Sequence, residues 1–225
     1  SYSAKQDRSK VTFFVKTVEE KIKLEKRVSR FNEDTLKGLL RYVLIRTSKH
    51  YDELMVVLVV SQLNFPGQRN FINELVALHP EITTIVENVN SRKTNVVLGN
   101  VEKVLYGKGF IKDSILGLSF EISASSFYQI NPIQVEKLYK TAADLLNPNK
   151  EDVLLDAYSG VGTIGLVLAD KVKKVISVEI NKSASRNAIE NAKRNNVTNA
   201  EFYCNDASKF IDEYEGNFIC NRECI

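Results

Sequence analysis

The most restrictive feature of the sequence is a strand-like run, Val153–Asp156, that leads through a glycine-rich turn into a helical pattern. The glycines of this turn are Gly160, Gly162 and Gly165, and they have the spacing G-x-G-x-x-G. Glycine accepts positive φ and lets the backbone approach a ligand closely, while the next helix presents unpaired N–H groups at its start. The turn therefore predicts a nucleoside-cofactor site, with a plain tight turn as the alternative.

After this turn, strand and helix patterns alternate almost to the last residue. The expected elements are a helix from about Thr163 to Ala169, strand Val175–Glu179, helix Ser183–Asn195, strand Glu201–Cys204 and a short helix near Ala207–Tyr214. The order βαβαβα predicts an α/β fold with a parallel sheet and right-handed crossovers. In the second helix, Ala184, Ala188 and Ala192 recur every four residues and predict a face that lies close against the sheet.

Three parallel strands make only the first half of a doubly wound sheet, and a buried strand left at an edge is a liability. The last ten residues, Gly216–Ile225, leave room for no more than the start of a fourth strand. We therefore expect a chain that is cut short. The open edge also allows a dimer of two copies.

The chain before this half-sheet has a different organisation. Within Leu39–Val60 two β-rich runs flank the polar turn Lys49–Asp52, and a helix over Gly67–His79 precedes a strand at Ile82–Glu87. A further helix is expected after Pro132, where apolar residues recur at helical spacing and form one stripe: Val135, Leu138, Tyr139, Ala142, Ala143 and Leu146. We assign residues 36–130 to an α+β central domain, 131–147 to a linker helix and 148–225 to the half-sheet.

Residues 1–35 form a basic arm, with nine Lys or Arg against four acidic residues up to Arg30. A solvated surface is the plainer interpretation of the arm, and contact with phosphates is the alternative. The net charge of +3 over 225 residues neither demands nor excludes a nucleic-acid partner. The chain has no apolar run of membrane-spanning length and no signal-peptide pattern at its start, so we expect a cytoplasmic protein without a membrane partner.

Ionisable residues indicate which nucleoside cofactor the turn accepts. Glu179 follows Gly160 by 19 residues and ends the second strand, where a carboxylate can bind both hydroxyls of a ribose. Asp156 ends the first strand; it would repel a pyrophosphate and favour the ammonium and sulfonium groups of S-adenosylmethionine over NAD or FAD. Asp206, after the third strand, could accept the adenine amino group or act as the N-cap of the next helix.

Two motifs together resemble one family. The segments Ser126–Pro132 (SFYQINP) and Asp156–Leu166 (DAYSGVGTIGL) resemble the bacterial RNA uracil-5-methyltransferases, which make 5-methyluridine in 23S ribosomal RNA or transfer RNA. The resemblance extends from about Leu36 to Asp206 and is closer to the ribosomal branch. It implies a Rossmann-like S-adenosylmethionine-dependent methyltransferase half-sheet preceded by an α+β central domain, with 23S ribosomal RNA as the expected partner.

The resemblance also implies roles for single residues. Gln129 would contact the cofactor, Tyr158 would pack beside it, and Thr163 would lie near the methionine moiety. Glu179 would bind the ribose, and Asp206 would lie near the adenine. Phe127 and Tyr128 could instead belong to a core beneath the linker helix, and this alternative is the plainer one for both.

In the family, a cysteine adds to carbon 6 of uracil, carbon 5 takes the methyl group, and a carboxylate then removes the proton. The family's DPPR-type and SCNP motifs do not occur in this sequence. Cys220 precedes an asparagine, as the family nucleophile does, but Arg222 follows instead of proline, so Cys220 is a weak candidate. We therefore expect this chain to be inactive by itself.

The remaining sulfur and imidazole groups indicate no further site. Cys204 is expected to be a small core residue and Cys224 an incidental thiol, both reduced. His50 and His79 are too far apart in the sequence to suggest a metal site, and iron–sulfur ligands are not expected. A non-catalytic RNA- or cofactor-binding fragment is the rival hypothesis, and a nicotinamide-dependent oxidoreductase is a weaker one.

Overall fold

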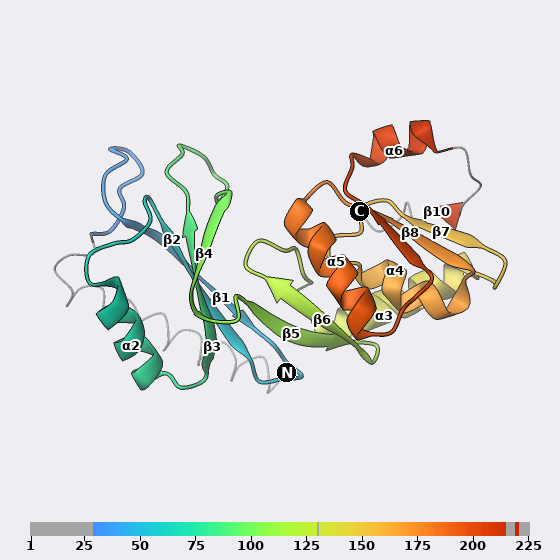
Figure 1. Cartoon of the computed structure of the whole chain (residues 1–225), viewed down its shortest axis with the longest axis horizontal. Helices are drawn as coiled ribbons and strands as arrows, with labels where there is room; N and C mark the ends of the chain where they lie inside the picture. The colour runs from blue at the N-terminus through green and yellow to red at the C-terminus, as the bar shows by residue number, and fades with distance from the viewer. Residues whose placement is uncertain (1–28, 130, 215–218, 221–225) are drawn as a thin grey trace. The chain divides into compact units, whose positions relative to one another are not determined.

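A computed structural model describes residues 29–129, 131–214 and 219–220 of the chain (Figure 1). The chain divides into two compact units. The first unit ends at Ile111, except that Lys49–Tyr51 group with the second unit, which continues from Lys112. Most of the basic arm predicted for residues 1–35 lies outside the described residues.

The first unit is built on a four-stranded sheet in the order β1-β2-β3-β4. Its strands are β1 (Leu40–Thr47), β2 (Leu54–Val60), β3 (Ile82–Val89) and β4 (Val101–Gly107). β1 and β2 form the predicted antiparallel hairpin, and helix α2 (Gln68–Leu78) crosses over to β3, which is parallel to β2. Helix α2 buries Phe71, Ile72 and Leu75 in one hydrophobic cluster with residues of the sheet. The predicted helix between Gly67 and His79 is thus confirmed.

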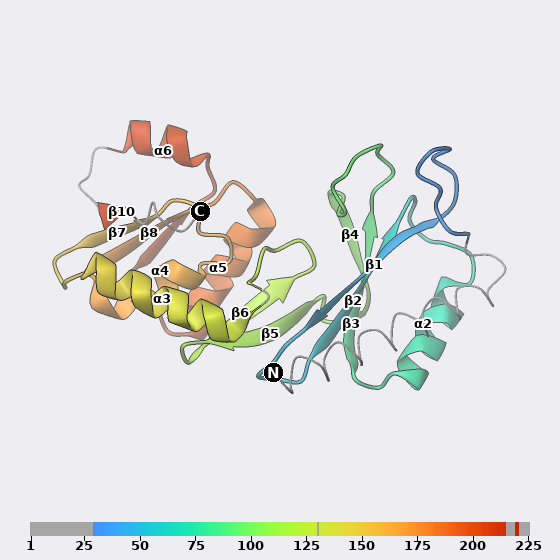
Figure 2. The same cartoon turned by 180° about the vertical axis from the view of Figure 1, so that it is seen from behind.

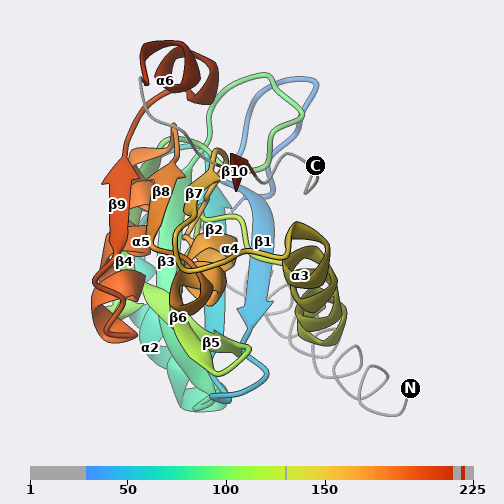
Figure 3. The same ribbon diagram turned by 90° about the vertical axis from the view of Figure 1, so that its right-hand side faces the viewer.

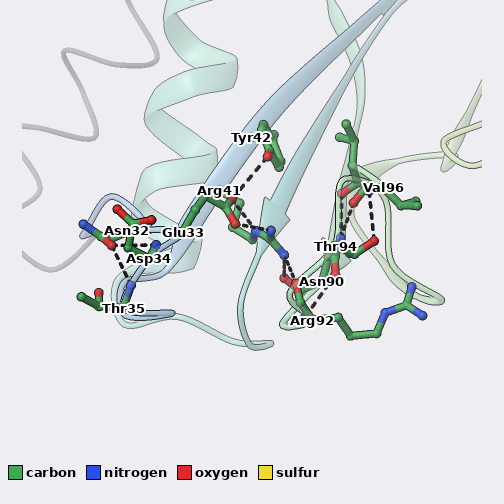
Figure 4. Close-up of polar contacts among 11 residues, drawn as sticks. Asn32, Glu33, Asp34, Thr35, Arg41, Tyr42, Asn90, Arg92, Thr94 and Val96 are labelled. Carbon is green, nitrogen blue, oxygen red and sulfur yellow. Dashed lines mark hydrogen bonds and ion pairs between the residues drawn. The ribbon is translucent and has the colours of Figure 1, made fainter.

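Two loops of the first unit are joined by one buried guanidinium (Figure 4). The Arg41 side chain is 0% exposed and donates hydrogen bonds to both carboxylate oxygens of Glu33, at 3.0 and 2.6 Å. It also donates to the carbonyl oxygens of Asn90 and Arg92, at 2.8 and 2.9 Å, and lies 4.6 Å from the centre of the Phe31 ring. Because a buried charge is costly unless it is paired, these partners hold the loop before β1 against the loop after β3.

A second hairpin, which the sequence analysis did not predict, joins β5 (Phe110–Ile115) to β6 (Leu118–Ser123). Its turn residues Leu116 and Gly117 both have positive φ, 50° and 83°. Ile115 and Phe120 share a hydrophobic cluster with residues of later helices, so the hairpin is grouped with the second unit from Lys112 onward. The structural division therefore falls earlier than the boundary expected near residue 130, because these apolar side chains pack with the later part of the chain.

The second unit contains a parallel sheet in the order β10-β7-β8-β9, which Figure 3 shows in sequence across the view. The strands are β7 (Val153–Asp156), β8 (Lys174–Val178), β9 (Ala200–Tyr203) and β10 (Ile219–Cys220). The helices are α3 (Pro132–Leu146), α4 (Thr163–Leu168), α5 (Lys182–Arg194) and α6 (Ala207–Glu213), and a 3-10 turn, η1 (Ala169–Lys171), follows α4. The predicted βαβαβα order and parallel pairing are confirmed.

Strand β10 lies on the opposite side of β7 from β8. Ile219 pairs with Leu154 and Cys220 with Leu155, in parallel. The strand order runs from β7 through β8 to β9 and then resumes with β10 on the other side of β7. The carboxyl ends of β7 and β10 therefore form a topological switch point. Ligands of open α/β sheets bind at such a point, outside the carboxyl ends of the strands.

The core of the second unit lies on both faces of β7 and β8, where Leu154, Leu155 and Ile176 are 0% exposed. The alanine face predicted for α5 is confirmed, since all three of its alanines are buried. Helix α3 lies beside α4 (Figure 2) and buries Val135, Tyr139 and Ala143. Leu138, expected on the same stripe, is 49% exposed, because the buried face of α3 is narrower than the apolar pattern.

Within the residues that the structure describes, the helices lack the combination of length and apolar composition that crossing a bilayer requires.

Candidate functional site

The predicted site residues gather at the carboxyl ends of three neighbouring strands. Asp156 is the last residue of β7, Glu179 directly follows β8, and Asp206 comes three residues after the end of β9. The N–H of Glu179 donates to the carbonyl oxygen of Tyr203, 3.0 Å away, so the loops after β8 and β9 stay in contact beyond the strands. The parallel sheet therefore brings these three carboxylates to one edge.

The glycine loop, residues 157–162, leads from β7 into α4. Gly162 is the N-cap of α4 and has a left-handed backbone, with φ 83° and ψ 18°. No side chain at that position caps the helix; instead the Oδ2 atom of Asp156 accepts a hydrogen bond from the N–H of Gly165, at 3.0 Å. A Cβ atom on Gly165 would lie only 2.9 Å from Cγ1 of Val175, so the start of α4 can approach the strands this closely only with glycine there.

The environment of Asp156 sets its charge. The residue is 4% exposed, and burial raises the pKa of its carboxyl group from 3.8 to about 6. The hydrogen bond from Gly165 acts in the opposite direction, while the nearby Glu179 adds to the increase. At neutral pH the group is ionised, and its negative charge lies beneath the start of α4. Its carboxylate accepts a hydrogen bond from the backbone of the helix, so its influence on a ligand would pass through that backbone.

Glu179 is held beside the glycine loop by two backbone groups. Its Oε2 atom accepts from the N–H of Gly160 at 2.9 Å, and its Oε1 atom accepts from the N–H of Asn181 at 2.7 Å. Each carboxylate oxygen has two lone pairs, so both can accept a further donor. The side chain is thereby fixed in direction before any ligand is present, which is what a ribose-binding carboxylate requires.

The side chains of Thr163 and Asp206 are each held by hydrogen bonds within the protein. The Thr163 hydroxyl lies 2.8 Å from the Tyr139 hydroxyl, which joins α3 to the first residue of α4. Asp206 is the N-cap of α6, because its Oδ1 atom accepts from the N–H groups of Ser208 and Lys209 at 3.0 and 3.1 Å. The N-cap interpretation of Asp206 is confirmed. Both bonds use the same oxygen.

Three large hydrophobic side chains, in the glycine loop, after Glu179 and in the SFYQ segment, are exposed instead of packed. Tyr158 in the glycine loop is 71% exposed, Ile180 after Glu179 is 69% exposed, and Phe127 is 73% exposed. The core interpretation of Phe127 is therefore wrong. Tyr128 is half-buried against the cluster that contains Val135, and burial raises the pKa of its hydroxyl.

The SFYQ segment, Ser126–Gln129, is anchored at its first residue. Ser126 is 2% exposed, and its Oγ atom accepts from the Asn187 amide of α5 at 2.9 Å. Gln129, the predicted cofactor contact, is half-buried at the other end of the segment. Asn187 and the fully buried Asn191 on the same helix are not among the residues predicted for the site. The signal that could have found them is the recurrence of asparagine every four residues, which continues at Asn195.

The cysteines occupy positions that differ from expectation. Cys204 is exposed, so its assignment to the core is wrong; β9 ends at Tyr203, and the next residue has left the sheet. The backbone of Cys220 lies in β10, in register with Leu155, and Cys224 lies outside the described residues. Among the described residues, no group of three or more His, Cys, Asp or Glu side chains could hold a metal ion.

Comparisons with known proteins identify the family. A profile described as tRNA (Uracil-5-)-methyltransferase matches residues 78–222. Two curated relatives, each described as an uncharacterised RNA methyltransferase, are similar to most of the chain. The relative from Lactiplantibacillus plantarum is 42% identical over 182 residues, which cover 81% of this chain and 40% of the relative. The relative from Oceanobacillus iheyensis is 39% identical over 188 residues, which cover 84% and 41%.

A solved structure has a similar fold. The Pyrococcus abyssi tRNA (uracil-54, C5)-methyltransferase, determined in complex with S-adenosyl-L-homocysteine, aligns with a TM-score of 0.69 and 29% identity. The alignment covers 84% of this chain and 45% of that one. The chain spans about two fifths of the length of the curated relatives it matches. With a profile match over more than half of its residues, the chain belongs to the tRNA (uracil-5-)-methyltransferase family.

Proposed function

We propose that this chain carries the S-adenosylmethionine-binding part of an RNA (uracil-5-)-methyltransferase. The observation that carries the proposal is the Glu179 carboxylate, fixed beside the glycine loop by the N–H groups of Gly160 and Asn181. A carboxylate held in this way can accept the hydroxyl groups of a ribose. A Cβ atom added to Gly160 would have no neighbour within 4 Å, so the loop has open space for a ligand. S-adenosylmethionine supplies the methyl group when it is bound.

The other residues would bind and orient the ligand. The ionised Asp156 places negative charge beneath the start of α4, which favours a ligand that carries ammonium and sulfonium groups. Tyr158 and Ile180 offer exposed apolar surface for the adenine ring. Asp206 can cap α6 through Oδ1 and accept the adenine amino group through Oδ2, so its two predicted roles are compatible.

Gln129 and Thr163 complete the proposed site on the strength of the family resemblance. Gln129 would contact the ligand from the SFYQ segment, where it is half-buried. Thr163 would lie near the methionine moiety, with its hydroxyl oriented by Tyr139 at 2.8 Å. Of the glycines, Gly160 and Gly162 allow the loop its positive φ values of 54° and 83°.

Calorimetric titration of the 225-residue chain tests the proposal. S-adenosylhomocysteine and S-adenosylmethionine should bind, and Glu179→Gln should weaken both, because one oxygen then has to serve the backbone and the ribose. Losing hydrogen bonds to a charged group costs about 1.5–3 kcal/mol, which corresponds to roughly 10–100-fold in affinity. Glu190→Gln is the matched control, since Glu190 is exposed on α5 and pairs with Lys193. Tighter binding of NAD, or equal affinities of both variants, would contradict the proposal.

For the reaction, we propose methylation of carbon 5 of a uridine in 23S ribosomal RNA. The SFYQ and glycine motifs resemble the ribosomal RNA branch of the family more closely, and transfer RNA is the alternative substrate. Methyl transfer to each RNA by the full-length protein distinguishes them. The 225-residue chain alone is expected to show no turnover, since the family's SCNP motif does not occur in it and Cys220-Asn221 is followed by Arg222 instead of proline. Turnover by this chain, lost in Cys220→Ala, would overturn that expectation. Salt-dependent RNA binding without methyl transfer by the full-length protein would support a binding function instead.

A further inference from the structure

Three asparagines lie on one side of α5 and meet the edge of strand β6, which Figure 1 shows beside the helix. Asn187 and Asn191 are in α5, and Asn195 directly follows it. Positions four residues apart on a helix are separated by about 6 Å, and positions two residues apart on a strand by about 6.7 Å. A row of asparagines on the helix can therefore follow every second residue of the strand.

The hydrogen bonds follow this spacing. The Asn195 amide accepts from the N–H of Ser119 at 2.9 Å and donates to the carbonyl oxygen of the same residue at 2.7 Å. The Asn191 amide accepts from the N–H of Glu121 at 2.7 Å. A neighbouring strand would make bonds of the same kind, so the asparagine row serves β6 as a partner along its edge.

Asn191 has a second bond that sets it apart. Its Nδ2 atom donates to the carbonyl oxygen of Val161 in the glycine loop, at 3.0 Å, and the residue is 0% exposed. One fully buried amide thus joins the glycine loop, α5 and β6. Buried polar groups are costly when a partner is lost, so both bonds resist displacement of the loop.

Asn187 makes the corresponding connection to the SFYQ segment. Its Nδ2 atom donates to the Oγ atoms of Ser123, at the end of β6, and of Ser126, at distances of 3.1 and 2.9 Å. The two serine hydroxyls are themselves 2.5 Å apart. The segment that carries Gln129 is therefore tied to the same helix face as the glycine loop.

We propose that Asn187 and Asn191 are positioning residues, which hold the SFYQ segment and the glycine loop in a fixed relation before a ligand binds. The identity of the ligand rests on the proposed function, but the positioning rests on the bonds alone. A site that is ordered in advance loses less conformational entropy on binding, so the two amides raise ligand affinity without touching the ligand.

The test uses the same substitution at two asparagines. In Asn191→Asp and Asn195→Asp the carboxylate still accepts from β6, but the donor is lost. Only the first change removes a bond to the glycine loop. Hydrogen exchange of the ligand-free chain should rise at least about tenfold in the glycine-loop peptide of Asn191→Asp, and affinity for S-adenosylhomocysteine should fall by about tenfold or more. Asn195→Asp should change neither.

Asn187→Ala tests the other connection at a half-buried residue, and it stays informative should Asn191→Asp fail to fold. Exchange in the SFYQ segment should rise, while the glycine loop keeps its wild-type exchange. Unchanged exchange of the SFYQ segment in Asn187→Ala, or equal loosening of the glycine loop by both aspartate variants, would overturn the proposal. A wild-type chain that binds no S-adenosylhomocysteine would contradict the proposed function, but the exchange rates would still decide the positioning.

Discussion

Helices α4 and α5 follow successive strands of one parallel sheet, yet they begin in different ways. The N-cap of α5 is Asn181, in an extended conformation, whose Oδ1 atom accepts from the N–H groups of Ser183 and Ala184. The N-cap of α4 is the left-handed Gly162, and its capping oxygen comes from Asp156 at the end of β7. The difference shows that a helix start can be capped from the sheet beneath it, which leaves its outer side without a capping side chain.

The two helices also differ at their third residue. Gly165 and Ala184 occupy this position in α4 and α5, and their N–H groups donate over 3.0 and 3.1 Å. A Cβ atom on Gly165 would meet Val175, Asp156 and Ser177 at 2.9, 3.1 and 3.3 Å, whereas α5 accommodates the alanine. The start of α4 is thus pressed against the strands that carry its cap.

The largest expected difference between the two caps is their response to pH, because only α4 is capped by an ionisable group. The folded pKa of Asp156, about 6, lies above its ordinary value of 3.8. Stability from this group is therefore complete below about pH 4 and is lost as pH rises to about 6, by at most about 3 kcal/mol. Urea unfolding at several pH values measures the change.

Asp156→Asn should remove this dependence, since the amide is neutral at all these pH values and still offers an oxygen to Gly165. Asn181→Ala, at the cap of α5, should leave it intact and serves as the control. If the pH profile of Asp156→Asn matched that of the wild type, the dependence would belong to other groups.

The second largest effect on stability is expected at the third residue of α4. Gly165→Ala should destabilise the chain by about 2 kcal/mol, because an overpacked methyl group displaces Val175 or the capping carboxylate. The reverse change in α5, Ala184→Gly, should cost only about 1 kcal/mol, the usual penalty of glycine in a helix. Chemical denaturation of both variants decides the order, and an equal loss would mean that the two helix starts are packed alike.

How far these features could be predicted depends on how local their causes are. The β7–α4–β8–α5 order was predictable because its strands are short apolar runs and its turns carry glycine. The β5–β6 hairpin was missed because the inward position of Asp113 breaks the apolar alternation. Asp113 is 3% exposed and bonds His50, 2.8 Å away but 63 residues earlier, a partner that no local pattern reveals.

The same distinction applies to the site. Glu179 could be placed from its distance to Gly160 and its position at a strand end, and Asp206 from the start of a helix. The asparagine spacing on α5 could have drawn attention to Asn191 but not to its role, because its partner Glu121 is 70 residues away. Cys204 was misplaced because the sequence cannot tell on which residue β9 ends.

A smaller effect is expected at the N-cap of α4. Gly162→Ala would force an L-residue to φ 83° and bring its Cβ atom to 3.2 Å from that of Ala188. The left-handed conformation costs roughly 1–2 kcal/mol for residues other than glycine. Thermal unfolding should show the loss, and Gly117→Ala is the control with the same φ of 83° and no neighbour within 4 Å. An equal or larger loss in the control would mean that contact with α5 does not add to the strain.

The smallest effect is expected from the cap of α5. Asn181→Ala should cost about 1 kcal/mol, as for other exposed caps, because the N–H groups of Ser183 and Ala184 lose their acceptor. Ligand affinity should stay unchanged, since Glu179 is held by the backbone N–H of residue 181, which alanine retains. Denaturation and calorimetric titration of the same variant measure both quantities.

Glu179→Gln differs from Asn181→Ala by lowering the affinity for S-adenosylhomocysteine; it also takes the acceptor from the N–H of Gly160 or of Asn181, so some stability should be lost as well. At α5 the cap and the proposed ligand contact are thus separate side chains, while at α4 Asp156 caps the helix and would also set the charge beneath the proposed ligand. If Asn181→Ala weakened the binding of S-adenosylhomocysteine as strongly as Glu179→Gln, the start of α5 would belong to the ligand site. The contrast between the two helices would then be one of capping geometry alone.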